Sequence, residues 1–219
     1  MRNIEFNSFL LSKIISPLPG PLVSSFERLQ PDSIEYRNTT FQSRYRCFSS
    51  YRIDGENVIR DDSLRPLFNG QRKFHTTYQN TVPSPDKELI ASGANEELLA
   101  HLLPAFPLRN PENYAFGINQ VRVIADDIHL GSPAPGLHQD GYAYSCHCNI
   151  SRENVSGGAS LLSKTSNPTD IFIEHILQPN EFVFFDDRKL FHTATPITQR
   201  LIGEPTWRDM IIIDVMEKA

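Results

Sequence analysis

The sequence predicts a mainly β fold, an antiparallel barrel or sandwich with flanking helices. Short segments rich in aromatic and β-branched residues recur along the chain, separated by turns containing Gly, Pro and Asp. Only residues 94–103 have a strong helical pattern. The chain of 219 residues is long enough to bury a substantial core. These features are typical of an all-β architecture with few helices.

The chain is expected to divide into an N-terminal arm, residues 1–33, and a single domain, residues 34–219. The arm contains an apolar patch that Glu5 precedes and Lys13 divides, so neither a signal peptide nor a membrane span is predicted. Prolines within residues 17–21 would break a helix, which leaves short helical pieces on either side of a turn. The arm could cover a barrel edge or contact another subunit.

Residues 34–59 contain two predicted strands that turn at Asp54-Gly55. Arg44 and Arg46 lie at positions i and i+2 of the first strand and therefore share a face. They could bind a substrate carboxylate, although solvent or acidic neighbours are the more common partners of such a pair.

A helix is predicted over residues 94–103, because glutamates occupy its first turn, leucines recur at core-facing spacing and Pro104 ends it. Further prolines make residues 104–113 an irregular connection. Residues 73–78 could form another strand.

Residues 114–125 predict a strand directly before the segment that carries the chemistry. Its alternation allows either face to point inward. Gln120 and Arg122 could therefore contact a substrate or support a site, or they could form structural polar contacts on the opposite face. The loop at residues 130–136, with two prolines and two glycines, is expected to shape an entrance.

His138 and Asp140 form an H-x-D pair whose side chains leave the same face of an extended strand. Such a pair is common by chance. However, His192 follows 52 residues later (192 − 140), shortly after the strand-like residues 181–185. Two imidazoles and one carboxylate leave three octahedral positions open, which is the ligand pattern of non-heme Fe(II) oxygenases. His138, Asp140 and His192 are therefore the expected metal ligands and catalytic centre.

Arg208 lies 16 residues beyond His192 (208 − 192) and opens the apolar run at residues 210–213. A buried arginine needs an anion, and its planar fork suits a carboxylate. We therefore expect Arg208 to bind the distal carboxylate of a co-substrate. Tyr142 would continue on the ligand face if the strand after Asp140 stayed regular, and could line the substrate pocket or fill the barrel. The same alternation would place Tyr144 on that face.

The formal net charge of −5 and the absence of a basic block argue against nucleic acid or an anionic membrane as partners and leave small molecules. Three cysteines, Cys47, Cys146 and Cys148, suit a reducing cytoplasm. Cys146-His147-Cys148 lacks the second spaced pair that zinc sites use, so zinc is disfavoured. The sequence does not predict an oligomeric state.

These motifs resemble those of the bacterial Fe(II)/2-oxoglutarate-dependent dioxygenases that include L-isoleucine dioxygenase, a family of free amino acid hydroxylases. The similarity covers about residues 35–217 and includes segments 43–46, 119–122, 138–141, 149–160, 186–196 and 207–209. It implies a double-stranded β-helix, that is, a jelly-roll or cupin-like barrel. It also implies Fe(II), 2-oxoglutarate as co-substrate at Arg208, and O2, with ascorbate as a stimulant in vitro.

The resemblance further implies hydroxylation of an unactivated C–H bond of a free L-amino acid or close derivative, with succinate and CO2 as co-products. Arg44, Arg46 and Arg122 could then bind the substrate carboxylate, and Asp126 or Asp127 its amine. The same site could instead perform desaturation, cyclisation or oxidation of a carrier-bound or peptide-bound residue in natural-product biosynthesis. A non-oxygenase metal-binding barrel is a further alternative, which the predicted buried arginine argues against.

Overall fold

The computed structural model describes residues 8–32, 42–63, 82–131 and 136–218. The strands are β1 (Phe9–Lys13), β2 (Gln30–Pro31), β3 (Arg44–Asp54), β4 (Asn57–Arg60), β5 (Tyr114–Ile124), β6 (Tyr144–Glu153), β7 (Val155–Gly157), β8 (Ser160–Ser163), β9 (Ile171–His175), β10 (Glu181–Phe185), β11 (Phe191–Ala194), β12 (Ile197–Gln199) and β13 (Trp207–Glu217). The helices are α1 (Gly20–Ser25), α2 (Lys87–Ser92) and α3 (Ala94–Leu102), with 3-10 turns η1 (Phe26–Arg28), η2 (Leu103–Ala105), η3 (Pro111–Asn113) and η4 (Pro168–Asp170).

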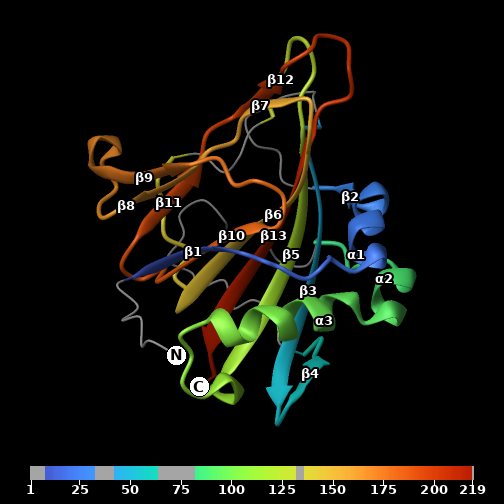
Figure 1. The fold of residues 1–219 in the computed structure, drawn as a ribbon, viewed down its shortest axis with the longest axis vertical. Coiled ribbons are helices and arrows are strands. Elements are labelled where there is room, and N and C mark those ends of the chain that lie inside the picture. Colours follow the sequence, from blue (N-terminus) through green and yellow to red (C-terminus); the bar gives the residue numbers. More distant parts are fainter. Residues whose placement is uncertain (1–7, 33–41, 64–81, 132–135, 219) are drawn as a thin grey trace.

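An 8-stranded antiparallel sheet forms the body of the fold, in the order β1-β10-β6-β13-β5-β3-β2 with β4 paired to β3. Two smaller sheets, β11-β8-β9 and β12-β7, complete the β structure (Figure 1). The mainly β prediction and the jelly-roll, double-stranded β-helix architecture are confirmed.

The two faces of the large sheet pack against different layers. One face carries Phe116 and Ile118 of β5, which share a core with Leu98 and Leu99 of α3. The opposite face packs on the β11-β8-β9 sheet through a second core of Leu162, Leu177, Val183, Phe185, Leu190 and Met210. Because strand residues alternate between faces, each strand contributes to both layers. We call the second face the inner face, since it also carries the metal-ligand cluster described below.

The N-terminal residues are part of the sheet. The expectation of helical pieces on both sides of a turn is wrong for Phe9–Lys13, which form the edge strand β1 along β10. Pairing with β10 stabilises this apolar segment as a strand, a long-range effect that local pattern does not reveal. The helix α1 starts within the proline-rich segment, with Pro19 as its N-cap and Pro21 in its first turn. The strand β1 covers a sheet edge, which is one of the two roles expected for the arm. The division at residue 33 stays a prediction.

Several local predictions are confirmed. The hairpin of β3 and β4 turns at Asp54-Gly55, where Gly55 has φ 59°. The strand β5 and the helix α3 lie where the sequence predicts them. The helix α2 was not predicted; Asp86 caps its N-terminus by accepting from two backbone N–H groups. Residues 73–78 lie outside the described residues.

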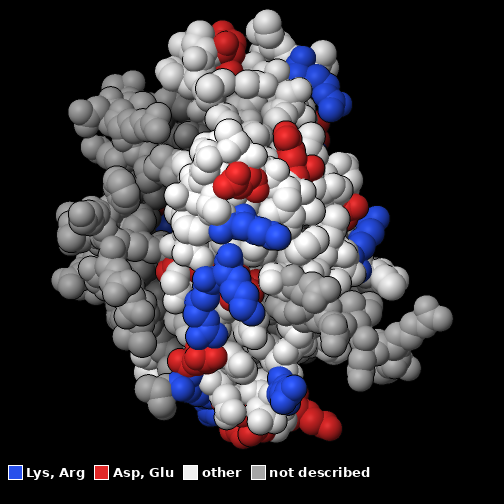
Figure 2. Space-filling model, turned by 90° about the vertical axis from the view of Figure 1, so that its left-hand side faces the viewer, with Lys and Arg blue, Asp and Glu red and all other residues white. Residues whose placement is uncertain are grey.

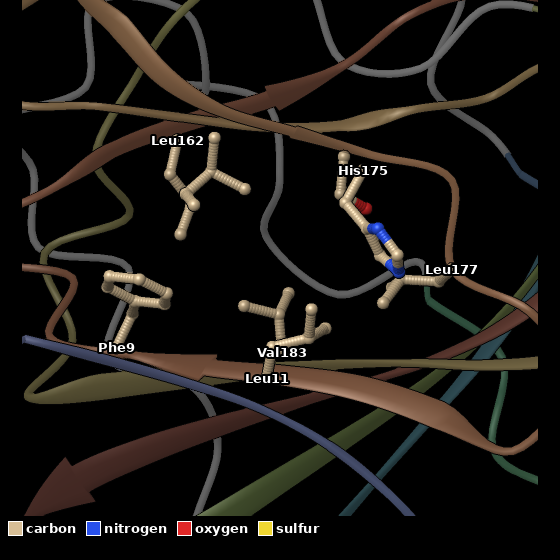
Figure 3. A pocket seen from close by; sticks show the side chains of 8 residues that line it. Phe9, Leu11, Leu162, His175, Leu177 and Val183 are labelled. Atoms are coloured by element: carbon tan, nitrogen blue, oxygen red, sulfur yellow. The ribbon is translucent and has the colours of Figure 1, made fainter.

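The described surface has a small apolar hollow and charged side chains of both signs. A small apolar hollow lies between β1, β10 and the β8-β9 pair and contains no residue of the metal triad (Figure 3). Basic and acidic side chains both occur on the face drawn in Figure 2, and several of them lie side by side. Among the helices that the structure describes, none has the length and apolar character needed to cross a membrane.

Candidate metal centre

The structure brings the three expected metal ligands together on the inner face. His138 lies next to β11, and its backbone N–H donates to the carbonyl of His192 at 3.1 Å, while the N–H of His192 donates back at 2.8 Å. Asp140 follows two residues later. Ligand atoms of all three side chains lie within 4.8 Å of one another, the one such cluster found in the described ranges. Two imidazole nitrogens and a carboxylate oxygen suit a divalent transition metal.

The hydrogen-bond acceptors around the two imidazoles favour the same tautomer. The Nδ1 of His138 donates to the carbonyl of Gly136 at 3.0 Å. The Nδ1 of His192 lies 3.3 Å from Oδ1 of Asp187. With Nδ1 protonated, each Nε2 keeps its lone pair. Both Nε2 atoms face the carboxylate of Asp140: that of His138 lies 3.7 Å from Oδ1, and that of His192 lies 3.3 Å from Oδ2. The donor set therefore fits an Fe(II) ion held through the two Nε2 atoms and one carboxylate.

The electrostatics of His192 favour a cation at this position. Burial opposes protonation of the imidazole, but the carboxylates of Asp140 and Asp187 stabilise the charged form and raise the pKa of His192 to about 9. The rings of Phe185 and His147 pack against its ring at centroid distances of 5.0 and 5.1 Å. A metal ion at Nε2 of His192, on the side of Asp140, would take the place of a second proton on the imidazole.

Asp187 is the functional residue that sequence reasoning missed, since residues 186–188 read as a polar turn. Its side chain is fully buried and accepts from the N–H of Asp140 at 3.0 Å and of Tyr142 at 2.9 Å. It thus holds the ligand loop and His192 at once. The only sequence signal is an acidic residue two positions after the apolar strand β10 and five residues before the second histidine.

The segment after His138 departs from a regular strand. Gly141 has φ +83°, which interrupts the alternation between the two faces. The expectation that Tyr144 shares the ligand face is therefore wrong, because its ring stacks on Phe184 at 5.2 Å in the core on the helix side. Tyr142 is buried beside the metal ligands, with its backbone N–H bound to Asp187.

Arg208 is buried on the inner face of β13. Its Nε donates to Oδ1 of Asn149 at 3.3 Å, while its Nη2 has no hydrogen-bond partner among the described residues. No carboxylate in the part of the chain that the structure describes forms an ion pair with it. Burial and the nearby charge of Arg152 lower the pKa of Arg208 to about 9. This buried cation without a counter-charge fits the distal carboxylate of 2-oxoglutarate.

Arg44 and Arg46 also lie on the inner face, opposite the side of β3 that enters the helix-side core. Both contact Asp32, at 3.6 and 3.7 Å, and the Nη2 of Arg46 donates to Oδ1 of Asn119 at 2.8 Å. The amide of Asn119 in turn donates to Oδ2 of Asp214 at 2.9 Å. A polar network of both charge signs therefore extends across the inner face.

Asp214 is the buried acidic end of this network. Burial raises its pKa well above the usual range, and the carboxylates of Asp140 and Asp187 raise it further. Its Oδ1 has no hydrogen-bond partner within the described ranges. A cationic ligand group at this oxygen would relieve both effects.

Gln120 and Arg122 do not join the metal cluster, because they lie on the helix-side face of β5. The amide of Gln120 donates to the hydroxyl of Ser25 at 3.0 Å. The guanidinium of Arg122 donates to both carboxylate oxygens of Asp209, at 2.7 and 2.8 Å, and to Glu27 at 2.9 Å. Of the two roles expected for Gln120 and Arg122, the structure shows structural polar contacts on the face away from the metal cluster.

Asp126 and Asp127 also lie apart from the ligands. Asp126 accepts from the backbone N–H groups of Ile128 and His129 and contacts the His129 ring. Both of its carboxylate oxygens therefore have partners within the same loop. Asp127 is exposed. The expected amine contact from either residue therefore has no support in this geometry.

Comparisons with solved structures show proteins of the same fold. The IDO protein of Bacillus thuringiensis has a solved structure similar to this chain, with a TM-score of 0.74 and 18% identity, covering 98% of this chain and 93% of the other. A BsmA homologue of Methylobium petroleophilum gives 0.69 at 19% identity, covering 90% and 80%. TqaL, an Fe(II)/α-ketoglutarate-dependent dioxygenase, gives 0.63 at 12%, covering 96% and 83%.

No curated protein sequence matches the chain. The family model described as 2OG-Fe dioxygenase matches residues 23–214, which include every metal ligand and Arg208. Members of this family are oxidoreductases that use Fe(II), 2-oxoglutarate and O2. The chain belongs to the 2OG-Fe dioxygenase family.

Proposed function

We propose that this enzyme hydroxylates an unactivated C–H bond of a free L-amino acid or a close derivative. The observation that carries the proposal is the polar network on the inner face that joins Arg44 and Arg46 to the buried carboxyl of Asp214. A zwitterion offers one carboxylate and one ammonium group to such a surface. The resemblance to L-isoleucine dioxygenase supports the same substrate class.

In this proposal His138, Asp140 and His192 would hold Fe(II) through two imidazoles and one carboxylate. Arg208 binds the distal carboxylate of 2-oxoglutarate. Bound iron supplies the redox centre at which 2-oxoglutarate and O2 become succinate and CO2, while one oxygen atom enters the substrate C–H bond to give C–OH.

The protein's own residues fix the geometry of this centre. Gly136 and Asp187 keep protons on Nδ1 of His138 and His192, so that both Nε2 atoms remain free to bind metal. Asp187 also holds the loop that carries Asp140. Burial of His192 and Arg208 excludes water from the co-substrate side, where a stray oxidant would damage the protein.

At the substrate end, Arg44 and Arg46 would bind the carboxylate and Asp214 the ammonium group. The Oδ1 of Asp214 has no partner in the described part of the chain, and its raised pKa reflects burial among like charges. An ammonium ion beside this oxygen would favour the ionised carboxylate.

The buried cysteines Cys47 and Cys146, both free thiols, support action in a reducing compartment, as the cytoplasmic prediction requires.

The test measures succinate and product mass after incubation with Fe(II), 2-oxoglutarate, O2 and ascorbate across free L-amino acids. We expect one amino acid to stimulate succinate formation and to gain one oxygen atom. Its methyl ester and its 2-hydroxy acid analogue, which remove the carboxylate charge and the amine respectively, should be poorer substrates. His138→Ala should abolish turnover, whereas His101→Ala, at an exposed position on α3, should leave it unchanged.

The outcomes separate the alternatives. A product that has lost two hydrogens would indicate desaturation or cyclisation at the same centre. Stimulation only by carrier-bound or peptide-bound residues would contradict the free amino acid proposal. Full activity of His138→Ala would refute the assigned ligand set.

A further inference from the structure

A group of unpaired hydrogen-bond donors lies beside Arg208. On β6, Arg152 is the register partner of Arg208, and Asn149 is the partner of the next inner-face residue, Met210. The Nη2 of Arg208, the Nη1 of Arg152 and the Nδ2 of Asn149 are all buried without a hydrogen-bond partner among the residues that the structure describes. Three unpaired donors at one place are costly, because each buried polar group loses its bonds to water.

The side chains of Arg208 and Arg152 both pack close to Gly158. A Cβ atom at Gly158 would lie 3.2 Å from Cδ of Arg208 and 3.3 Å from Nη1 of Arg152, and 2.9 Å from the side chain of Ile197. Gly158 also has φ +69°, a conformation that side chains disfavour. The absence of a side chain at Gly158 therefore lets the side chains of Arg208 and Arg152 both lie close to the backbone of this residue.

The charges of this group are unbalanced. Neither arginine forms an ion pair with any carboxylate of the described residues. Burial lowers the pKa of both, and Arg152 lowers that of Arg208 further, while the exposed Arg200 acts on Arg152. Arg152 is also anchored, because its Nη2 donates to the carbonyl of Gly157 at 2.6 Å. It cannot turn to solvent without breaking this bond, and its Nη1 stays directed into the group.

We propose that Arg152 and Asn149 complete the site for the distal carboxylate of 2-oxoglutarate, with Arg152 as a second charged donor beside Arg208. This inference rests on the proposed role of Arg208. A carboxylate has two oxygens with about four acceptor directions, enough for the three unpaired donors. The Oδ1 of Asn149 already binds Nε of Arg208, so the amide both orients that guanidinium and offers its own N–H.

The site predicts a strong requirement for the distal carboxylate. Two fixed cations and one amide recognise a dicarboxylate, and they gain nothing from a ligand that has only the 2-oxo acid end. 2-Oxopentanoate matches 2-oxoglutarate in chain length and in its 2-oxo acid group but lacks the second carboxylate. The pair of ligands therefore isolates the contribution of the proposed donors.

The experiment is calorimetric titration of both ligands into the anaerobic Fe(II)-loaded protein. In Arg152→Gln, 2-oxoglutarate should bind about tenfold or more weakly, since a charge-assisted contact is lost, while the affinity for 2-oxopentanoate should stay within about twofold. Arg152→Lys keeps the charge without the planar fork and should give an intermediate affinity. Arg200→Gln removes an exposed charge near the same end and should match the wild type for both ligands.

Unchanged 2-oxoglutarate affinity in Arg152→Gln would overturn the inference, and so would an equal loss for both ligands, which would indicate a structural role. If Arg152→Gln does not fold, Arg152→Lys decides by the same comparison of the two ligands. Arg208→Gln separates the two proposals. If Arg208→Gln binds 2-oxoglutarate like the wild type, the proposed role of Arg208 fails. If Arg208→Gln weakens binding and Arg152→Gln does not, only the proposed role of Arg152 fails.

Discussion

Replacing Asp187 with Asn should weaken both metal binding and the fold, although it changes one atom. The carboxylate now accepts from Asp140 through Oδ1 and from Tyr142 through Oδ2. An amide has one oxygen, so one backbone N–H must face a side-chain NH2 group. Each orientation of the substituted amide leaves a buried donor without an acceptor.

The magnitude follows from these contacts. Loss of one hydrogen bond to a charged acceptor costs about 1.5–3 kcal/mol, and the unsatisfied N–H adds about 1–3 kcal/mol. Removal of the charge also relieves repulsion with Asp214, so the net loss should lie toward the lower end, about 3 kcal/mol. For a chain of this size, that corresponds to a decrease in Tm of roughly 6–12 °C.

The effect on metal arises through His192. If the nitrogen of the new amide faces Nδ1, it favours the tautomer with a proton on Nε2, which cannot bind metal. Loss of such a supporting contact weakens metal affinity by about 10- to 100-fold. Competition with a chelator for Co(II) measures the affinity, and thermal unfolding of the metal-free protein measures stability.

Asp186→Asn is the matched control. The side chain of Asp186 binds Lys189 and the N–H of Arg188, and none of its contacts in the described structure is with a metal ligand. Its metal affinity should equal that of the wild type. Wild-type Co(II) affinity in Asp187→Asn, or equal losses in both variants, would refute the proposed link between Asp187 and the metal centre.

Three further changes test other parts of the structure. Arg208→Met should raise the Tm of the ligand-free protein by removing an unpaired buried charge, while 2-oxoglutarate binds about 10- to 150-fold more weakly in titrations; a lower Tm would contradict the buried-charge argument. Asp86→Ala should cost about 1 kcal/mol in urea unfolding at pH 7, whereas Asp86→Asn should keep the cap. Burial tends to raise the pKa of Asp86, but its hydrogen bonds and Arg28 outweigh burial and lower the pKa overall. The contribution of Asp86 is therefore present above the unfolded pKa of about 4 and is lost as the pH falls through the lowered folded pKa, so the Ala penalty should shrink in acid below about pH 4. Gly158→Ala should lower Tm and, by displacing the arginines packed against it, weaken 2-oxoglutarate binding; wild-type binding would show that their close approach to Gly158 is not needed for the ligand.

Features governed by local chemistry were predictable from the sequence. The helix α3 has acidic residues at its start and a proline after its end, and the β3–β4 hairpin has a glycine where positive φ is needed. The metal ligands were predictable as residue types at a recognisable spacing. The structure then placed His138 and His192 on paired backbone segments, which no local pattern specifies.

Features governed by long-range contacts were not predictable. Alternation along β5 allowed either face to point inward, and the contact of Gln120 with Ser25, 95 residues away, shows which face meets α1. The interruption at Gly141 moved Tyr144 to the helix-side core. Asp187 reaches the ligand loop through hydrogen bonds that span 45 and 47 residues, so its role depends on the completed barrel.

Hydrogen-bond partners distinguish the roles of two arginines on this sheet, Arg122 and Arg208. Arg122 and Arg208 lie on the paired strands β5 and β13 and are both arginines in apolar surroundings, so sequence treats them alike. Arg122 is fully used by Asp209 and Glu27, and a ligand would have to break those bonds. Within the described residues, Arg208 has a free donor, a depressed pKa and a neighbour, Arg152, that also has an unpaired donor, so an arriving carboxylate breaks no ion pair and supplies the missing charge. The energetic cost of the ligand-free site is therefore what makes it selective for an anion.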